Sequence, residues 1–496
     1  MKKIILFVID SLHPVVLGRI LCEGNAPALC FLAQHGTYFE RVVSSFPTMT
    51  PVATSTMVTG AGPDRHGIPG FIWYDGESRK VVDYGATWQS VLKMGPKNII
   101  LNLLSKLNRE HLALETPTIY ETLEAAGFST GNINLFMHRA AHPFQAKLPF
   151  LISLATGFQL RQKEIFGPSH LTLGQLVHLP FSRRLPAYPR GVFHRFGFND
   201  VFSGTVARQL VREGILPDFT MVYFPDNDKN SHYYGPLRTG PSIERADQQI
   251  GLVLKEFGSW EKALEETVVI VTGDHSQSTV GLGRDYLIDL DHALKSFTRL
   301  RSTEEAIEGQ QEIAICPNER MAFIYILQRQ QEILPRIVDI LVKDARNAQI
   351  AWKIAENKYS VLQGGTGKQL YFSRDGLIHD VYGQSWSYDG DLSVLDAHVA
   401  EEQTVRFGKF PDAFNRLISA LEARQESRVV VSAVSGYEYF AEGAPIHPGG
   451  GSHGSLEEED STVPMIVTGR PLKLENPRIV DLYPLILNHF AIENFR

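Results

Sequence analysis

Acidic residues and histidines follow three apolar segments of the chain, at the point where each segment ends. Asp10 follows "IILFVI", the stretch "PDNDKNSH" follows "FTMVYF", and Asp274 and His275 follow "TVVIVT". Parallel strands end at one edge of a sheet, so we expect these side chains to lie close together. Crowded carboxylates and imidazoles are unfavourable without a cation, and they are typical ligands of hydrolytic metal sites. The spacing therefore predicts a metal site.

A late histidine and a threonine complete the candidate set. His453 lies in "GGGSHGS", a glycine-rich loop that can approach the same edge. Thr50 precedes Pro51, which favours a helix start, and such a helix would direct N–H groups at an anion. A threonine hydroxyl is a weak nucleophile, and a metal ion bound to its oxygen activates it by lowering its pKa. These residue types predict nucleophilic chemistry on an anionic substrate.

Six motifs resemble those of the type I phosphodiesterase and nucleotide pyrophosphatase branch of the alkaline phosphatase superfamily. They are "FVIDS", "FPTMTPVATSTMVTG", "GPDRHGI", "DKNSHYYGP", "TGDHS" and "GSHG", and they stand in the family's order across nearly the whole chain. The resemblance implies two divalent metal ions; zinc is the metal we expect, and manganese also suits these ligands. The implied ligands are Asp10, Thr50, Asp274 and His275 for one ion, and Asp228, His232 and His453 for the other.

The resemblance also implies a reaction. The chain would be a dinuclear metal-dependent hydrolase of phosphate esters, with phosphodiesters as the expected substrates. Thr50 would attack phosphorus and form a phosphothreonine intermediate that water then cleaves. Two successive in-line displacements give net retention of configuration at phosphorus.

Three of these residues have a neighbour of the same type that competes for the role. The pairs are Asp228 with Asp226, Thr50 with Thr48, and His453 with His447. Asp226 would then cap or support the site, Thr48 would bond the backbone of a turn, and His447 before a proline would be structural. His66 in "DRHGI" is interpreted as part of the scaffold.

One feature departs from the family pattern. Phosphodiesterases of this branch commonly carry an asparagine shortly after "HGI", whereas Phe71 stands at about that position here. Phe71, Trp73 and Tyr74 could form an apolar wall beside the metal ions. Lys229 and Arg65 are the nearest cationic residues in the sequence. Monoester or phosphonate hydrolysis on the same scaffold therefore stays open, as does a metal-loaded binding protein without turnover.

The elements around these residues predict an α/β fold with a doubly wound, mostly parallel sheet of the alkaline phosphatase type. Apolar strands are expected at residues 4–9, 219–224, 267–272, 428–434 and 463–469, and helical patterns alternate with them. We expect a catalytic core in three parts and two insertions. The core parts are residues 1–137, 201–285 and 426–496, and the insertions are a loop-rich segment at 138–200 and an α+β cap at 286–425.

Composition limits the class of protein. The 496 residues are 43% hydrophobic and 21% charged, with a formal net charge of −7, which indicates a globular protein without the basic footprint of a nucleic-acid binder. The expected partner is a small phosphate ester rather than a nucleic acid duplex, and the oligomeric state stays open. No apolar run reaches the length of a membrane span. The three cysteines show no paired spacing, so we expect a cytoplasmic location.

Overall fold

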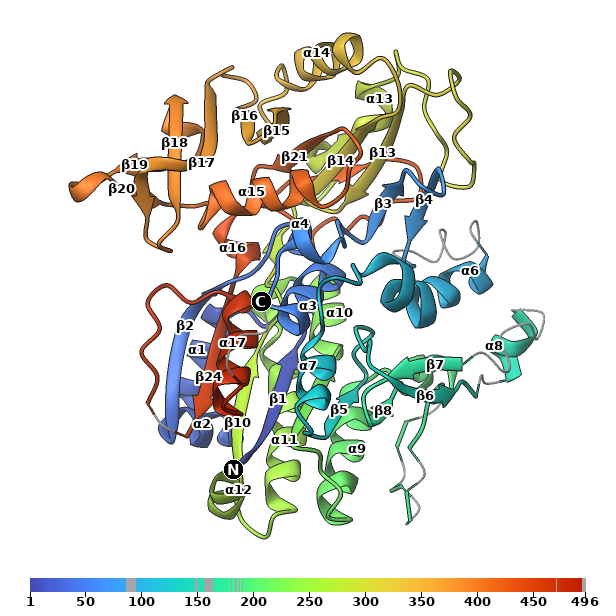
Figure 1. The fold of residues 1–496 in the computed structure, drawn as a ribbon, viewed down its shortest axis with the longest axis vertical. Helices are drawn as coiled ribbons and strands as arrows, with labels where there is room; N and C mark the ends of the chain where they lie inside the picture. Colours follow the sequence, from blue (N-terminus) through green and yellow to red (C-terminus); the bar gives the residue numbers. More distant parts are fainter. Residues whose placement is uncertain are drawn as a thin grey trace.

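A computed structural model gives the fold of the chain, drawn in Figure 1. It describes residues 1–85, 95–147, 150–155, 164–179, 181–182, 185–186, 188–189, 191–469 and 471–492. The segment predicted as the loop-rich insertion, 138–200, therefore lies partly outside the described residues.

Seven strands form the core sheet, in the order β2-β24-β10-β1-β9-β5-β8. The strands are β1 Lys3–Ile9, β2 Gly36–Val43, β5 Thr130–Ile133, β8 His170–Thr172, β9 Phe219–Phe224, β10 Thr267–Thr272 and β24 Thr462–Thr468. Neighbours from β10 to β8 are parallel, whereas β24 runs antiparallel to both β10 and β2. The sheet occupies the lower half of Figure 1. This confirms the predicted mostly parallel sheet.

Helices cover both faces of this sheet because successive side chains of a strand point to opposite faces. Residues 4, 6 and 8 of β1 belong to one hydrophobic cluster, and residues 5, 7 and 9 belong to another. The first cluster includes side chains of α3 Thr50–Thr59, α7 Ile119–Ala125 and α17 Leu482–His489. The second includes side chains of α1 Pro14–Glu23, α2 Pro27–Gln34, α9 Asp200–Arg212, α11 Gly240–Lys255 and α12 Trp260–Glu266. The fold is therefore doubly wound.

A second sheet lies in the upper half of Figure 1 and forms the cap. Its order is β13-β14-β21-β15-β16-β17-β20-β19, with β18 paired to β17. The strands are β13 Ile313–Asn318, β14 Met321–Ile326, β15 Asn347–Ala355, β16 Lys358–Leu362, β17 Gln369–Asp380, β18 Ser385–Gly390, β19 Ala397–Val399, β20 Thr404–Phe407 and β21 Arg428–Ala433. Helix α14 Gln330–Leu341 packs on one face and α15 Ala413–Glu422 on the other. This agrees with the expected α+β cap.

Two sequence predictions about strand membership are wrong. The strand at 428–434 forms, but as β21 it lies antiparallel between β14 and β15 of the cap sheet, not in the core. Its two faces are buried by α14 and α15, which gives the same continuous apolar run as a parallel core strand. Residues 170–172, assigned to the loop-rich insertion, form β8 at the edge of the core sheet. The other domain boundaries stay predictions.

Short elements connect the two sheets and carry the loops near the core's strand ends. They include α4 Pro63–His66, the hairpin of β3 Ile72–Asp75 and β4 Lys80–Asp83, α10 Asp226–Tyr234, β22 Glu438–Phe440 and β23 Gly451–Ser452. Within the described residues, no single helix combines the length and apolar composition of a membrane span, although α1 and α2, bent by 94°, meet that test as a pair.

Candidate metal centre

Four predicted ligands converge where β1 and β10 end and α3 begins. Asp10 follows β1, Asp274 and His275 follow β10, and Thr50 is the first residue of α3. His275 Nε2 lies 3.1 Å from Thr50 Oγ1, 3.7 Å from Asp10 Oδ1 and 3.6 Å from Asp274 Oδ2. These are the four residues that the family resemblance assigns to one ion. The fold thus brings together one oxygen from each of three residues and one ring nitrogen.

The carboxylates of this group need a positive partner. Asp10 Oδ1 and Asp274 Oδ2 are buried, and neither has a hydrogen-bond partner among the described residues. Burial and the neighbouring carboxylates of Asp274 and Asp228 raise the pKa of Asp10 well above its ordinary value. Buried carboxylate oxygens without a partner are unfavourable, so this chemistry fits a divalent cation.

The three residues assigned to the other ion also lie together. Asp228 and His232 are separated by one turn of α10, and His453 follows β23. Asp228 Oδ1 lies 3.3 Å from His232 Nε2 and 3.8 Å from His453 Nε2. Burial raises the pKa of Asp228, but the neighbouring histidines outweigh it and hold the pKa well below its ordinary value. The ring of His453 stacks 4.0 Å from that of His275, so the two groups are adjacent.

Two of the three competing neighbours, Asp226 and Thr48, lie outside these groups, whereas His447 forms a possible metal-binding group with His232 and Glu319. Asp226 accepts hydrogen bonds from Arg195 and from the backbone N–H of Asp200. Thr48 Oγ1 donates to Ser455 O and accepts from the backbone of the His453 loop. These contacts match the supporting roles expected for Asp226 and Thr48.

His447 lies closer to the centre than expected. Its ring stacks 4.2 Å from that of His232, while its Nδ1 lies 3.1 Å from Glu438 Oε2. The contact with Glu438 agrees with a structural role, and the stacking places the ring against a predicted ligand.

The start of α3 offers fewer N–H groups than the sequence implied. Pro51 has no N–H, and the N–H groups of Val52 and Ala53 both donate to Met49 O. The N–H of Thr50 itself has no hydrogen-bond partner among the described residues. An anion at this helix end would therefore accept one backbone hydrogen bond, from the Thr50 N–H, and interact with the helix dipole. The next residues offer no further free N–H groups.

Sequence reasoning missed several residues that reach the centre, among them Ser11 and Gln277, whose side chains donate to Asp228 Oδ1. The hydroxyl of Tyr223, the penultimate residue of β9, donates to Asp10 Oδ2. Arg195 comes from the 138–200 segment and interacts electrostatically with Asp228 and Asp10. Glu319 comes from the β13–β14 turn of the cap and lies 3.5 Å from His453. Tyr223 could have been found as a polar residue near a strand end, whereas no local pattern marks Arg195 or Glu319.

The aromatic wall expected after "HGI" does not form as a unit. Trp73 is fully buried and its ring meets His111, and Tyr74 packs against Tyr325. Phe71 is only partly buried, and its backbone N–H donates to Asn318 Oδ1. Only Phe71 of the three is therefore accessible. Lys229 and Arg65, the cationic candidates from the sequence, are exposed.

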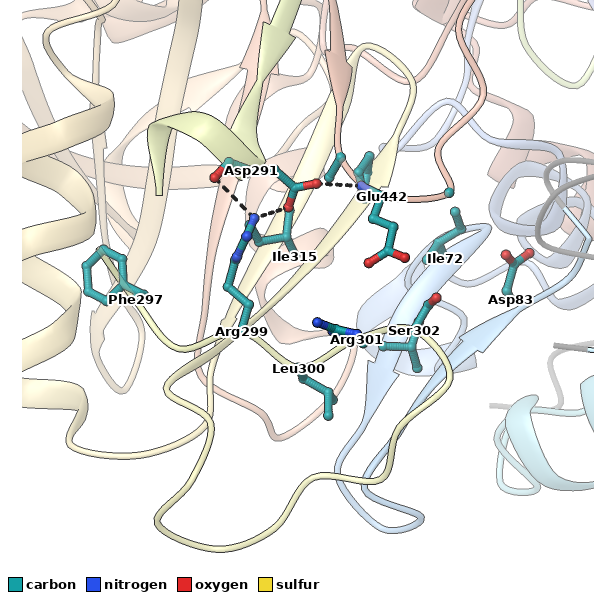
Figure 2. A pocket seen from close by; sticks show the side chains of 14 residues that line it. Ile72, Asp83, Asp291, Phe297, Arg299, Leu300, Arg301, Ser302, Ile315 and Glu442 are labelled. Atoms are coloured by element: carbon teal, nitrogen blue, oxygen red, sulfur yellow. Dashed lines mark hydrogen bonds and ion pairs between the residues drawn. The ribbon is translucent and has the colours of Figure 1, made fainter. Parts of the chain in front are cut away.

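A cavity of about 460 Å³ lies between the β3–β4 hairpin and the cap, as Figure 2 shows. Its wall carries charges of both signs, with Arg299 paired to Asp291 at one side, Asp83 at the other and the Glu442 carboxylate between them. None of the seven predicted site residues lines it. The residues to which the sequence assigns chemistry lie at the strand ends and not at this cavity.

The chain is similar to known proteins in sequence and in fold. The family model described as type I phosphodiesterase / nucleotide pyrophosphatase matches residues 4–358. Murine ectonucleotide pyrophosphatase / phosphodiesterase 5 superposes with a TM-score of 0.57 at 14% identity, covering 100% of this chain and 96% of that chain. The human protein of the same name gives 0.57 at 15% identity, with coverage of 100% and 96%. An inactive threonine-to-alanine form of the murine protein, in complex with AMP, gives 0.56 at 14% identity, with the same coverage.

One curated relative shares a short stretch. A 2,3-bisphosphoglycerate-independent phosphoglycerate mutase of Pyrococcus horikoshii is 32% identical over 88 residues. The match spans 18% of this chain and 19% of that protein, less than a fifth of its length. The structural neighbours show the fold, and the family model covers most of the chain. The chain therefore belongs to the type I phosphodiesterase / nucleotide pyrophosphatase family and is a hydrolase acting on phosphoric esters.

Proposed function

We propose that the protein hydrolyses small phosphodiesters at a two-metal site, with Thr50 as the nucleophile. The observation that carries this proposal is the 3.1 Å contact between Thr50 Oγ1 and His275 Nε2, beside the unpartnered oxygens of Asp10 and Asp274. The inactive threonine-to-alanine form of murine ectonucleotide pyrophosphatase / phosphodiesterase 5 supports a threonine in this role.

The proposed ligands fit two divalent cations. Asp10, Thr50, Asp274 and His275 would hold one, and Asp228, His232 and His453 would hold the other. When bound, such cations lower the pKa of a coordinated hydroxyl and balance the charge that develops on phosphoryl oxygens. Nitrogen and oxygen donors suit zinc, which we propose as the native metal, and manganese is the alternative.

Hydrolysis would proceed by two displacements at phosphorus. Thr50 Oγ forms a bond to phosphorus, the bond from phosphorus to the leaving oxygen breaks, and the alcohol departs with one proton. A water molecule then attacks phosphorus, the bond to Thr50 Oγ breaks, and the threonine regains its proton. The Thr50 N–H, which has no other partner among the described residues, is positioned to donate to a phosphoryl oxygen.

The substrate would be a small molecule. The AMP in the solved murine relative supports a nucleoside phosphate as one half of the diester. Phe71, which is only partly buried, would contact an apolar or aromatic part of it. We also propose a cytoplasmic location, which the free thiols of Cys22, Cys30 and Cys316 support.

The variant Thr50→Ala tests the proposal. Hydrolysis of bis-p-nitrophenyl phosphate by the metal-loaded protein should fall on the order of 10³-fold or more, since removing a nucleophile eliminates the covalent route. Metal content should stay at about two ions per chain, because three other residues hold the first ion. Thr59→Ala, at the other end of α3, is the matched control and should keep its activity. Unchanged hydrolysis by Thr50→Ala would overturn the assignment.

A further inference from the structure

Glu319 enters the metal centre from the cap, although no family motif contains it. It occupies the tight turn between β13 and β14 with a φ of 60°, a left-handed conformation that is unfavourable for a residue with a side chain. Its side chain is 8% exposed. A strained backbone conformation at a buried carboxylate is maintained only when surrounding contacts hold the residue in place. The contacts of Glu319 are therefore informative.

The turn is fixed to the core loop that carries His453. The N–H of Arg320 donates to His453 O at 2.8 Å, and the N–H of Tyr439 donates to Glu319 O at 2.7 Å. The fully buried guanidinium of Arg320 forms ion pairs with Glu457 and Asp460 of the core. The cap therefore holds Glu319 in a defined position relative to the core.

The carboxylates of Glu319 and Asp228 each lie close to the ring nitrogens of His232 and His453. Glu319 Oε1 lies 3.5 Å from His453 Nε2 and 3.8 Å from His232 Nε2. Asp228 Oδ1 lies 3.8 Å and 3.3 Å from the same two nitrogens. Donors at about 2.0–2.2 Å from a tetrahedral zinc lie roughly 3.3–3.6 Å from one another. Two of these four carboxylate–imidazole separations, 3.3 and 3.5 Å, fall in this range, and the other two, both 3.8 Å, lie just above it.

The orientations of the two histidines and of Glu319 also suit ligation, while Asp228 Oδ1 accepts hydrogen bonds from Ser11 Oγ and Gln277 Nε2. His232 Nδ1 lies 2.8 Å from Gly451 O, and His453 Nδ1 lies 2.6 Å from Thr48 O. A carbonyl oxygen only accepts, so each Nδ1 carries the proton and each Nε2 can offer its lone pair. Glu319 Oε2 accepts from Ser452 Oγ and from the N–H of His453, which leaves Oε1 directed at the two Nε2 atoms.

We propose that Glu319 is a fourth protein ligand of the second metal ion, together with Asp228, His232 and His453. This proposal rests on the two-metal function above and adds to it a ligand supplied by the cap. His447 supports the site by stacking on His232 while Glu438 holds its Nδ1. Four protein donors fill a tetrahedral shell, so substrate would enter this site as a fifth donor, and the cap sheet would have to be docked for the site to be complete.

Metal binding by the purified full-length chain tests the proposal without an activity assay. Zinc would be titrated into chelator-treated protein in competition with a chromophoric chelator, and cobalt would be titrated separately while its visible spectrum is recorded. Glu319→Gln should bind the first equivalent as the wild type does and the second at least about tenfold more weakly. The cobalt band of the second equivalent should change in shape or intensity, because the donor set has changed.

Two control variants test whether weaker binding of the second metal ion results from the loss of Glu319 itself. Glu305→Gln removes an exposed carboxylate of the same cap, ion-paired to Lys80, and should bind both equivalents as the wild type does. His447→Ala should keep two metal ions. Circular dichroism of metal-free Glu319→Gln should match that of the wild type, since glutamine can still accept the bonds from Ser452 and His453. A misfolded variant would be replaced by Glu319→Asp, whose shorter side chain should also weaken the second equivalent.

Several results would overturn the inference. Wild-type affinity and an unchanged cobalt spectrum in Glu319→Gln would remove Glu319 from the ligand set while leaving the proposed function intact. The wild type could also bind a third metal ion that both Glu319→Gln and His447→Ala lose. This result would assign Glu319 to a separate metal site. A wild-type protein that binds no metal would contradict both this inference and the proposed function.

Discussion

The Nε2 atom of His275 lies 3.1 Å from the hydroxyl of Thr50, although the two residues are 225 positions apart in the chain. The contact joins the end of β10 to the first residue of α3. Parallel strands end at one edge of the sheet, and a helix that starts at this edge can present a hydroxyl to the acids gathered there. This relationship makes a nucleophilic role for Thr50 chemically reasonable.

Tyr223→Phe should weaken metal binding at the first site without changing the fold. The Tyr223 hydroxyl donates to Asp10 Oδ2, which orients the carboxylate and leaves Oδ1 directed at the centre. Loss of such an outer partner lowers metal affinity about 10- to 100-fold. Zinc titration in competition with a chelator measures the effect.

Tyr325→Phe provides the matched control for this change. Tyr325 is also buried but lies in the cap sheet, on β14. Its variant should bind zinc as the wild type does. Equal affinity in Tyr223→Phe and the wild type would contradict a supporting role for Tyr223.

Metal removal should destabilise the folded protein. The unpartnered oxygens of Asp10 and Asp274 stay buried beside one another when no cation balances them. Zinc at about 100 times its dissociation constant should add about 2.7 kcal/mol per site to the free energy of unfolding. Thermal unfolding of chelator-treated protein, with and without added zinc, measures the rise in Tm.

Asp274→Asn should lose part of that rise, because it removes one ligand of the first site. Asp389→Asn, on the exposed end of β18, is the control and should keep the full rise. A wild-type Tm that zinc does not change would contradict the assignment of these acids as metal ligands.

The sequence predicted the site better than the cap. Asp10, Asp274 and His275 follow buried strands, and the family motifs fixed which of Asp226 and Asp228 faces the cluster. The cap strand at 428–433 was misassigned because burial by helices on both faces erases the alternation that distinguishes antiparallel strands. Glu319 was missed because a turn residue reaches the site only through the docking of one sheet on another, which no local pattern encodes.

The buried histidine of "DRHGI" should make the protein sensitive to acid. His66 is fully buried, its Nδ1 accepts from Ile68 N, and burial lowers its pKa to about 3. The unfolded chain takes up this proton below about pH 6.5, whereas the folded chain does so only near pH 3, so acid favours unfolding across this window.

The variant His66→Gln measures this contribution. At pH 7 the wild type should be the more stable protein, because its buried contacts are intact. Its advantage in free energy of unfolding should shrink by up to about 1.4 kcal/mol for each pH unit below 6.5. Urea denaturation of both proteins between pH 7 and pH 4.5 measures the difference. An advantage that does not change with pH would show that His66 does not stay neutral in the folded state.

The stereochemistry of hydrolysis tests the central role of Thr50 most directly. One diastereomer of a nucleoside phosphorothioate diester would be hydrolysed in ¹⁸O-labelled water, and the configuration of the product at phosphorus would be determined. Attack by Thr50 followed by attack of water consists of two inversions, so we expect net retention of configuration. Net inversion would mean that water attacks phosphorus directly and would contradict the covalent intermediate on Thr50.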